Sequence, residues 1–301
     1  MTELQRYLAE EVAEDHADGI ITRREAMRRL GLLGVGGATA STLLTGFTAT
    51  AVAAAPEASR GRRRLSSHDT VDEWAPVATE AVTFPGPRGT LLGAWAAAED
   101  PAGAVLVIHE NRGLTPHIGS VAGRLAASGY SALAIDLLSE EGGTGAFPGE
   151  AEVAAALAAA PPERFDEDMR AGVDELKRRL PRKKVGAIGF CFGGGMVWRL
   201  LAAGEDRVAA AAPFYGPFPA GADLSGARAA VLGVYGGLDA RVNASRPTAQ
   251  AALEAAGLAH QILTFTEADH AFFNDTGARF NAPAAEEAWR RVIGWYGRFL
   301  D

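Results

Sequence analysis

The sequence predicts an α/β domain in which a doubly wound, mostly parallel sheet is covered by helices on both faces. From Glu80 to Asp301, short apolar runs alternate with longer segments whose apolar residues have helical spacing, a pattern typical of parallel sheets. The run Ala104–Ile108 is apolar without a break, as in strands that are buried on both faces. A chain of 301 residues can bury one sizeable core.

Turn residues mark the boundaries of the predicted elements. Pro85-Gly86-Pro87-Arg88-Gly89 separates two strand-like runs and predicts an opening antiparallel hairpin, and Gly129 ends the first helix of this region. The predicted strands are Ala81–Phe84, Leu91–Trp95, Ala104–Ile108, Ser131–Ile135, Lys184–Ile188, Val208–Phe214, Ala230–Tyr235 and Gln261–Phe265. The predicted helices are Ile118–Ala127, Arg164–Leu180, one that includes Met196–Leu201, Pro247–Ala256 and Ala284–Phe299. The long connections 141–162 and 217–225 are expected to shape a pocket.

Composition narrows the possible partners. The formal net charge of −8 and the isoelectric point near 5.4 argue against nucleic acid as a partner. A single cysteine excludes an intramolecular disulfide and a zinc site built from cysteines, and the six histidines form no HxxxH or HExxH pair. We therefore expect no cofactor and no metal, a small-molecule substrate, and a monomer.

The stretch Gly189-Phe190-Cys191-Phe192-Gly193-Gly194 lies between a predicted strand and a predicted helix. A reactive side chain between glycines at such a turn is the nucleophile-elbow pattern, here with cysteine in place of serine. The nucleophile of an elbow has strained backbone angles, and Cβ atoms at the neighbouring glycines would collide with the strand and the helix. Cys191 is therefore predicted to be a thiol nucleophile.

A thiol nucleophile needs a histidine that takes its proton and an acid that orients the histidine. Only His260 and His270 follow Cys191, and His270 is preferred because it lies beyond a strand end, whereas His260 lies at a strand entry. Asp239 follows the apolar run Val234-Tyr235 and a Gly-Gly turn, so it is the predicted acid. Asp269 and Asp275 are its rivals, and Asp136 is expected to be structural.

The first 79 residues have a different character. A polar start is followed by Thr22-Arg23-Arg24 and then by a charge-free run from Leu30 to Pro56 that is diluted by glycines. A basic region, an uncharged core and two A-x-A sequences within Ala51–Ala55 predict an export signal of the twin-arginine type. We therefore expect residues 1–55 to be an export signal read by the twin-arginine export machinery, 56–79 a flexible linker and 80–301 the catalytic domain.

Two other interpretations of this segment stay open. The uncharged run is long enough to span a bilayer, so an uncleaved membrane anchor is one alternative to an exported periplasmic or extracellular bacterial protein. A soluble N-terminal helix is the other, although the uncharged run lacks a polar face.

With Cys191, Asp239 and His270 in place, residues 80–301 resemble the dienelactone hydrolase family of α/β hydrolases. The motifs that carry the resemblance are His109-Glu110-Asn111-Arg112-Gly113, Ala134-Ile135-Asp136-Leu137, Gly189 to Gly194, Gly236-Gly237-Leu238-Asp239 and Asp269-His270-Ala271-Phe272. The resemblance implies an α/β-hydrolase fold and a Cys-His-Asp triad that cleaves a lactone or carboxylic ester, with chemistry of the carboxymethylenebutenolidase type.

The resemblance also implies roles for the loop after the third strand. Glu110 matches a family carboxylate that contacts and activates the thiol, and the backbone N–H groups of Phe192 and Asn111 would form the oxyanion hole. Arg112 is the nearest cation for Glu110 or for a substrate. The family holds the dienelactone carboxylate with arginines, one of them four residues after the catalytic histidine, where this chain has Asn274. Thioesters or peptide-like acyl groups are alternative substrates, and a secreted binding protein without catalysis is the alternative class.

Overall fold

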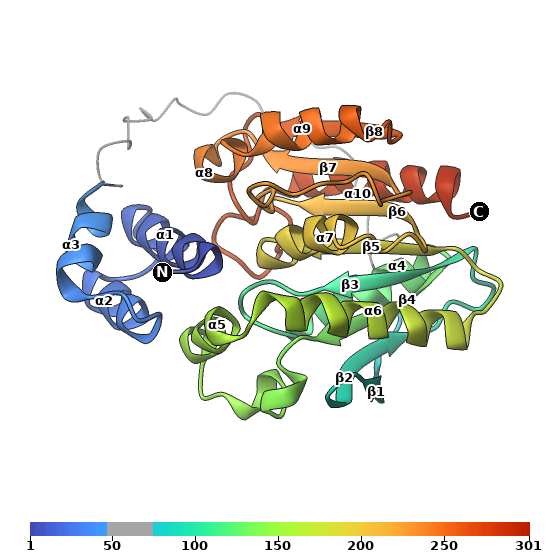
Figure 1. The fold of residues 1–301 in the computed structure, drawn as a ribbon, viewed down its shortest axis with the longest axis horizontal. Coiled ribbons are helices and arrows are strands. Elements are labelled where there is room, and N and C mark those ends of the chain that lie inside the picture. Colours follow the sequence, from blue (N-terminus) through green and yellow to red (C-terminus); the bar gives the residue numbers. More distant parts are fainter. Residues whose placement is uncertain (47–74) are drawn as a thin grey trace, which may run out of the picture.

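The computed structural model describes residues 1–46 and 75–301, and its centre is an eight-stranded sheet in the order β1-β2-β4-β3-β5-β6-β7-β8 (Figure 1). The strands are β1 (Glu80–Gly86), β2 (Gly89–Ala96), β3 (Gly103–Ile108), β4 (Tyr130–Asp136), β5 (Val185–Phe190), β6 (Val208–Phe214), β7 (Ala230–Gly236) and β8 (His260–Phe265). The β1–β2 and β2–β4 pairs are antiparallel and the other pairs are parallel. The predicted α/β fold with a mostly parallel sheet is confirmed.

Helices cover both faces of this sheet. In residues 80–301, the region predicted to be catalytic, they are α4 (Pro116–Ala127), α5 (Glu150–Ala159), α6 (Pro162–Arg179), α7 (Phe192–Ala202), α8 (Ala240–Asn243), α9 (Arg246–Ala255) and α10 (Ala282–Phe299). α6 and α7 lie on one face, and α4 and α10 lie on the other (Figure 1). The central strands β3, β4 and β5 are buried along their whole length, which explains their unbroken apolar runs.

The predicted boundaries differ from the structure mainly around the elbow. β5 continues two residues further than predicted, to Phe190, and α7 begins directly after Cys191 rather than near Met196. The three glycines Gly193–Gly195 indicate a turn when they are read along the sequence, yet they form the first turns of the helix. The short helix α8 was not predicted.

The N-terminal segment is folded onto the catalytic region as three helices, α1 (Glu3–Ala17), α2 (Arg23–Leu32) and α3 (Gly37–Gly46), drawn in blue in Figure 1. Thr22 caps α2 by accepting a hydrogen bond from the backbone N–H of Glu25, so the arginine pair stands exposed at the start of a helix. Within residues 1–46 and 75–301, no helix has the length and apolarity that a membrane span requires. The A-x-A sequences and residues 56–74 of the expected linker lie outside the described residues.

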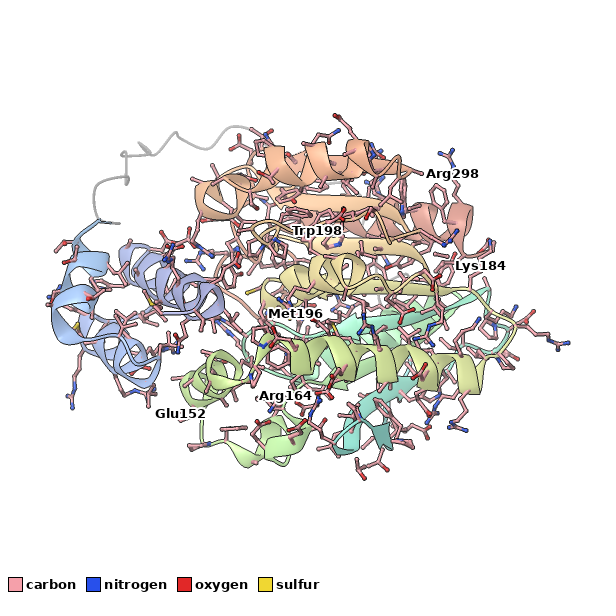
Figure 2. All side chains as sticks on the ribbon, in the orientation of Figure 1. Glu152, Arg164, Lys184, Met196, Trp198 and Arg298 are labelled. Carbon is pink, nitrogen blue, oxygen red and sulfur yellow. The ribbon has the colours of Figure 1, made fainter. Side chains whose placement is uncertain are left out.

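The parallel strands bring the predicted functional residues to one edge of the sheet. Cys191 directly follows β5, Asp239 follows β7, and His270 follows β8 after a short turn. Because neighbouring parallel strands end at the same edge, the loops after them meet there, as in other open α/β sheets. Figure 2 shows Met196 and Trp198 on α7, the helix that begins at this edge.

Candidate active site

The elbow has the strained geometry that its sequence pattern predicts. Cys191 has φ 56° and ψ −118°, in a region that residues with a Cβ rarely adopt. A Cβ at Gly189 would lie 2.1 Å from the backbone oxygen of Gly193, and a Cβ at Gly193 would lie 2.3 Å from that of Ile108. The glycines are therefore required so that β5 and α7 can approach each other and present the thiol at the sheet edge.

His270 and Asp239 are hydrogen bonded beside this thiol. Nδ1 of His270 lies 2.7 Å from Oδ2 of Asp239, and both side chains are almost completely buried. Asp239 Oδ1 also accepts the N–H of Val242, which fixes the carboxylate at the start of α8. Burial alone would raise the pKa of Asp239, but the charge of His270 and the hydrogen bond to it hold that pKa below its usual value.

The opposite ring nitrogen of His270 is directed towards the thiol. A ring nitrogen of His270 lies within 4.8 Å of Cys191 Sγ, and Nε2 is buried without a hydrogen-bond partner in the described part of the chain. Burial lowers the pKa of His270, but Asp239 outweighs burial and raises that pKa well above its ordinary value. The imidazole can thus hold a proton taken from sulfur.

The rival acids have other partners. Asp269 Oδ1 accepts the backbone N–H of His270 at 2.7 Å, and Asp275 pairs with His117 and Arg124. Neither carboxylate contacts the imidazole of His270, so the structure favours Asp239 as the orienting acid. Asp136 accepts the backbone N–H groups of Leu138 and Thr144, in agreement with a structural role.

Glu110 lines the same cavity as Cys191 but has no hydrogen bond to the thiol in the described part of the chain. Its Oε2 accepts a hydrogen bond from Nδ2 of Asn274 at 2.7 Å, and burial raises its pKa. Asn274, four residues after His270, therefore binds Glu110 in this chain. At this position the resemblance to the family implies an arginine that binds the substrate. Arg112 forms its ion pair with Glu150 at 3.3 Å, so the expected pair with Glu110 is absent and Arg112 acts on Glu110 only through its charge.

Two backbone N–H groups adjoin the elbow. Phe192 is the first residue of α7, so its N–H has no acceptor within that helix. Asn111 lies in the loop after β3. The neighbouring His109 is a packing residue. It accepts the N–H of Leu137 at Nε2, and its Nδ1 donates to the backbone oxygen of Glu110, which fixes the shape of this loop.

Two residues of α1 form hydrogen bonds with the sulfur. The hydroxyl of Tyr7 lies 3.3 Å from Cys191 Sγ, and both carboxylate oxygens of Glu11 lie 3.5 Å from it. Asn111 Nδ2 donates a hydrogen bond to Glu11 at 2.8 Å. No sequence pattern indicates these contacts, because Tyr7 and Glu11 lie about 180 positions from Cys191 in a segment that was predicted to be an export signal.

The donor atoms of Glu11, Cys191 and His270 all lie within 4.8 Å of one another, a separation at which three such groups could share a metal ion. The same sulfur and imidazole stand beside Asp239 in the arrangement of a nucleophile, a base and an orienting acid. This arrangement is the one that nucleophilic chemistry needs.

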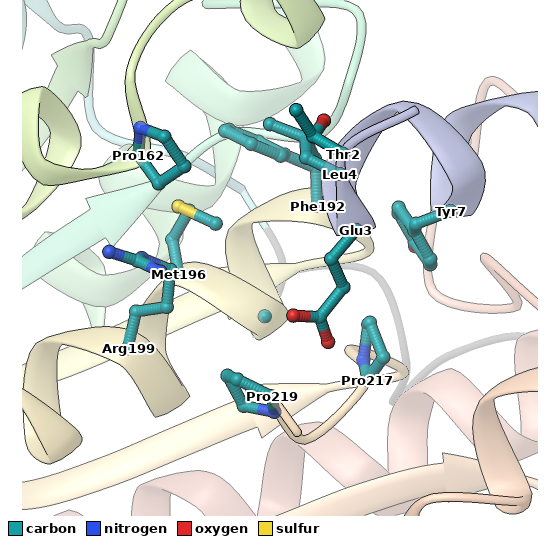
Figure 3. A pocket seen from close by; sticks show the side chains of 11 residues that line it. Thr2, Glu3, Leu4, Tyr7, Pro162, Phe192, Met196, Arg199, Pro217 and Pro219 are labelled. Atoms are coloured by element: carbon teal, nitrogen blue, oxygen red, sulfur yellow. The ribbon is translucent and has the colours of Figure 1, made fainter. Parts of the chain in front are cut away.

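An apolar cavity adjoins the elbow. Its walls are Phe192 and Met196 of α7 and the prolines Pro217 and Pro219 of the loop after β6, and the first turn of α1 closes one side (Figure 3). The predicted pocket-forming connection 217–225 therefore contributes to this cavity. A second, smaller cavity contains Cys191 and His270 themselves.

Comparison with known proteins places the chain in a class. The family model for the dienelactone hydrolase family matches residues 90–300, and the chain belongs to this family. It is accordingly a hydrolase of the lactone- and ester-cleaving class with an α/β-hydrolase-like fold.

Individual relatives agree with this assignment. A protein of Escherichia coli O157:H7 that carries the name carboxymethylenebutenolidase is 30% identical over 217 residues, which cover 67% of this chain and 79% of the relative. A crystal structure titled as a dienelactone hydrolase from Klebsiella pneumoniae is 25% identical, with a TM-score of 0.59 over 73% of this chain and 98% of that one. The dienelactone hydrolase-like promiscuous phosphotriesterase P91 from metagenomic libraries shares the fold, with a TM-score of 0.64 at 24% identity over 75% of this chain and 100% of that one. Helices α1–α3 lie outside the matched family region.

Proposed function

We propose that this protein hydrolyses a carboxylic ester or a lactone through a triad of Cys191, His270 and Asp239. The observation that carries the proposal is the buried Asp239–His270 hydrogen bond beside a cysteine on a strained elbow. Each group has the partner that its role needs: the acid fixes the imidazole, and the free ring nitrogen is directed towards the sulfur.

Acylation begins when the thiol proton of Cys191 passes to Nε2 of His270. The sulfur then attacks the carbonyl carbon, and the negative charge that develops on the carbonyl oxygen is stabilised by the N–H groups of Phe192 and Asn111. Collapse of this intermediate breaks the C–O bond, and the leaving alkoxide takes the proton from His270. The product of this step is a thioester on Cys191.

Deacylation uses the same groups. His270 takes a proton from water, the resulting hydroxide attacks the thioester carbonyl, and the thiolate leaves and recovers a proton from His270. Asp239 holds the imidazole in one orientation throughout. Esters and lactones suit a thiol nucleophile better than amides, because a thiolate is expelled more readily than an amine from the tetrahedral intermediate.

The surroundings of the triad support a largely neutral substrate. Asn274 replaces the family arginine that holds the dienelactone carboxylate, and it is already bonded to Glu110. The side chains that residues 80–301 contribute to the cavity beside the elbow are apolar apart from Arg199. We therefore propose a lactone or ester whose acyl or alkyl part is apolar.

Export through the twin-arginine route is part of the proposal. It is supported by Arg23 and Arg24, which stand exposed at the start of α2 after the capping residue Thr22. The A-x-A sequences that follow in the chain supply a place for cleavage. The mature protein would then begin after α3.

The test uses the exported protein and a panel of aryl esters, neutral lactones and carboxylate-bearing lactones. We expect turnover of the neutral substrates and none after Cys191→Ala. Intact-mass measurement during turnover should show one acyl group, located on Cys191 by peptide mapping. Equal rates for the parent and Cys191→Ala would eliminate the thiol mechanism.

A further inference from the structure

Helix α1 presents one face to the catalytic region. The side chains of this face share the spacing of one side of an α-helix and are polar or acidic: Tyr7, Glu11, Glu14, Asp15 and Asp18. Arg6 is exposed, and Glu10, one position before Glu11, lies at the margin of this face and is half-buried. Because burying an unpaired charge is costly, these inward carboxylates need cations on the surface of residues 80–301 that they contact.

Two arginines of the catalytic region receive this strip. Arg279 donates to Asp15 at 2.8 Å and to Asp18 at 2.5 Å, and its side chain is only 11% exposed. Arg241 donates to Glu14 at 3.2 Å and stacks on the ring of Tyr7 at 4.6 Å. Buried charge-assisted pairs of this kind fix an orientation more firmly than exposed ion pairs do.

The ends of the N-terminal segment are also attached. Glu3, in the first turn of α1, accepts the backbone N–H of Ala220 in the loop after β6. Arg28 of α2 donates to Glu152 at 2.7 Å, and Figure 2 shows Glu152 on the side of α5 that faces the N-terminal helices. The contacts thus run from the first turn of α1 to the middle of α2.

We propose that the cleft above Cys191 is a docking site for an acidic helix, and that α1 fills it in the full chain as a built-in inhibitor. The inference deepens the proposed function and rests on it, because it assigns a regulator to the same thiol. The occupant is a defined segment of this chain, and the complementary charges of its inward face and of Arg241 and Arg279 explain why this segment fits.

Docking blocks the reaction in two ways. Glu11 and Tyr7 stand at the sulfur, and the small cavity that contains Cys191 and His270 is bounded by Glu11 and other residues of the N-terminal segment. The docked carboxylate also accepts a hydrogen bond from the S–H group of Cys191, which favours the neutral thiol over the thiolate. Burial raises the pKa of Cys191, and the charge of Glu11 raises it further against the effect of His270.

The position of α1 in the chain connects this inhibitor to export. The A-x-A sequences within Ala51–Ala55 follow α3, so cleavage there would separate all three helices from residues 80–301. The tether between α3 and the catalytic region keeps the effective concentration of α1 high, and cutting the tether removes this advantage. Latency would therefore end when the signal is removed.

The test measures the reaction of Cys191 with iodoacetamide in the full chain. Labelling reports this residue alone, because it is the single cysteine. The undocked variant Tyr7→Ala/Glu11→Ala/Asp15→Ala changes only α1, and we expect it to label at least about tenfold faster than the parent. Ester turnover should rise in parallel.

Matched variants separate docking from general damage to the helix. Glu11→Gln and Glu10→Gln make the same change at adjacent positions of α1, and only the first should speed labelling. If circular dichroism shows that the undocked variant is poorly folded, a double-mutant cycle of Asp15→Ala and Arg279→Ala replaces it. Each single change should speed labelling, and the double change should add little to either.

Labelling that is equally fast in the parent, the undocked variant and Glu10→Gln would overturn the docking proposal, as would fully additive effects in the cycle. The two readouts distinguish the two proposals. Faster labelling without turnover in any form would retain the inhibitor and reject the hydrolase mechanism. Turnover that is lost in Cys191→Ala but unaffected by α1 would do the reverse.

Discussion

Replacing Asp239 by asparagine is the most direct test of the triad. The substitution removes a negative charge and changes almost no volume. Asparagine retains an oxygen that can accept the N–H of Val242, which Asp239 Oδ1 now accepts at 3.0 Å, so the start of α8 should persist. The variant therefore isolates the interaction with His270.

The size of the effect follows from the buried pair. Nδ1 and Oδ2 are 2.7 Å apart, and the two side chains are 0% and 1% exposed. With charge centres about 4 Å apart and an effective dielectric constant of about 20, the carboxylate stabilises the imidazolium by about 4 kcal/mol. This energy corresponds to about a thousandfold in rate. The asparagine amide can also donate to Nδ1, which would leave a proton on Nε2 and prevent that atom from acting as a base.

The assay is kcat/KM for an aryl ester in the undocked variant, so that α1 does not limit the rate. We expect Asp239→Asn to lose about a thousandfold. The control is Asp269→Asn, because Asp269 accepts the backbone N–H of His270 and lies 3.8 Å from Arg279 but has no hydrogen bond to the imidazole, and it should stay within about threefold of the parent. A variant of Asp239 that retains a tenth of the activity or more, or an equal loss in Asp269→Asn, would refute the assignment of the acid.

Three further outcomes are expected. The variant Arg23→Lys/Arg24→Lys, in which export is blocked, should retain α1 and label slowly at Cys191, whereas the exported protein should label as fast as the undocked variant. Equal labelling rates in the two proteins would show that export does not release α1. With α1 docked, burial and the charge of Glu11 raise the pKa of Cys191, with a smaller contribution from Glu110 and against the effect of His270. Docking is therefore fully favoured at pH values below the thiol pKa of the undocked form, and it weakens as the pH rises towards the thiol pKa of the docked form. The labelling profile of Glu11→Gln should accordingly lie at lower pH than that of the parent, and coincident profiles would contradict this. Gly193→Ala, whose new Cβ would meet backbone oxygen, should lower the free energy of unfolding in urea by about 1–3 kcal/mol, and unchanged stability would contradict the close approach at the elbow.

The sequence predicted the strands well because their signal is local. β6 (Val208–Phe214) coincides with its predicted range, and the central strands carry unbroken apolar runs that follow directly from burial on both faces. Parallel pairing then brings strand ends together, which is why Cys191, Asp239 and His270 could be grouped without coordinates.

Contacts between distant segments were beyond such reasoning. The partner of Arg112 is Glu150 on α5, and Asn274 holds Glu110, although neither pairing has a sequence signature. The start of α7 was also misplaced, because glycines disfavour a helix in isolation and are retained here for the space they leave. Tertiary packing overrides the local preference at this point.

In these proposals the N-terminal segment carries two signals in one stretch of sequence. Its arginine pair and uncharged run indicate export, and the acidic face of α1 forms ion pairs with Arg241 and Arg279. These uses do not conflict, because Arg23 and Arg24 are exposed while the acidic face is turned inward. A helix that seals the thiol and lies on the part of the chain removed after export would couple the location of the enzyme to its activity. A reactive thiol would then be covered until the protein reached its destination, with no separate inhibitor required.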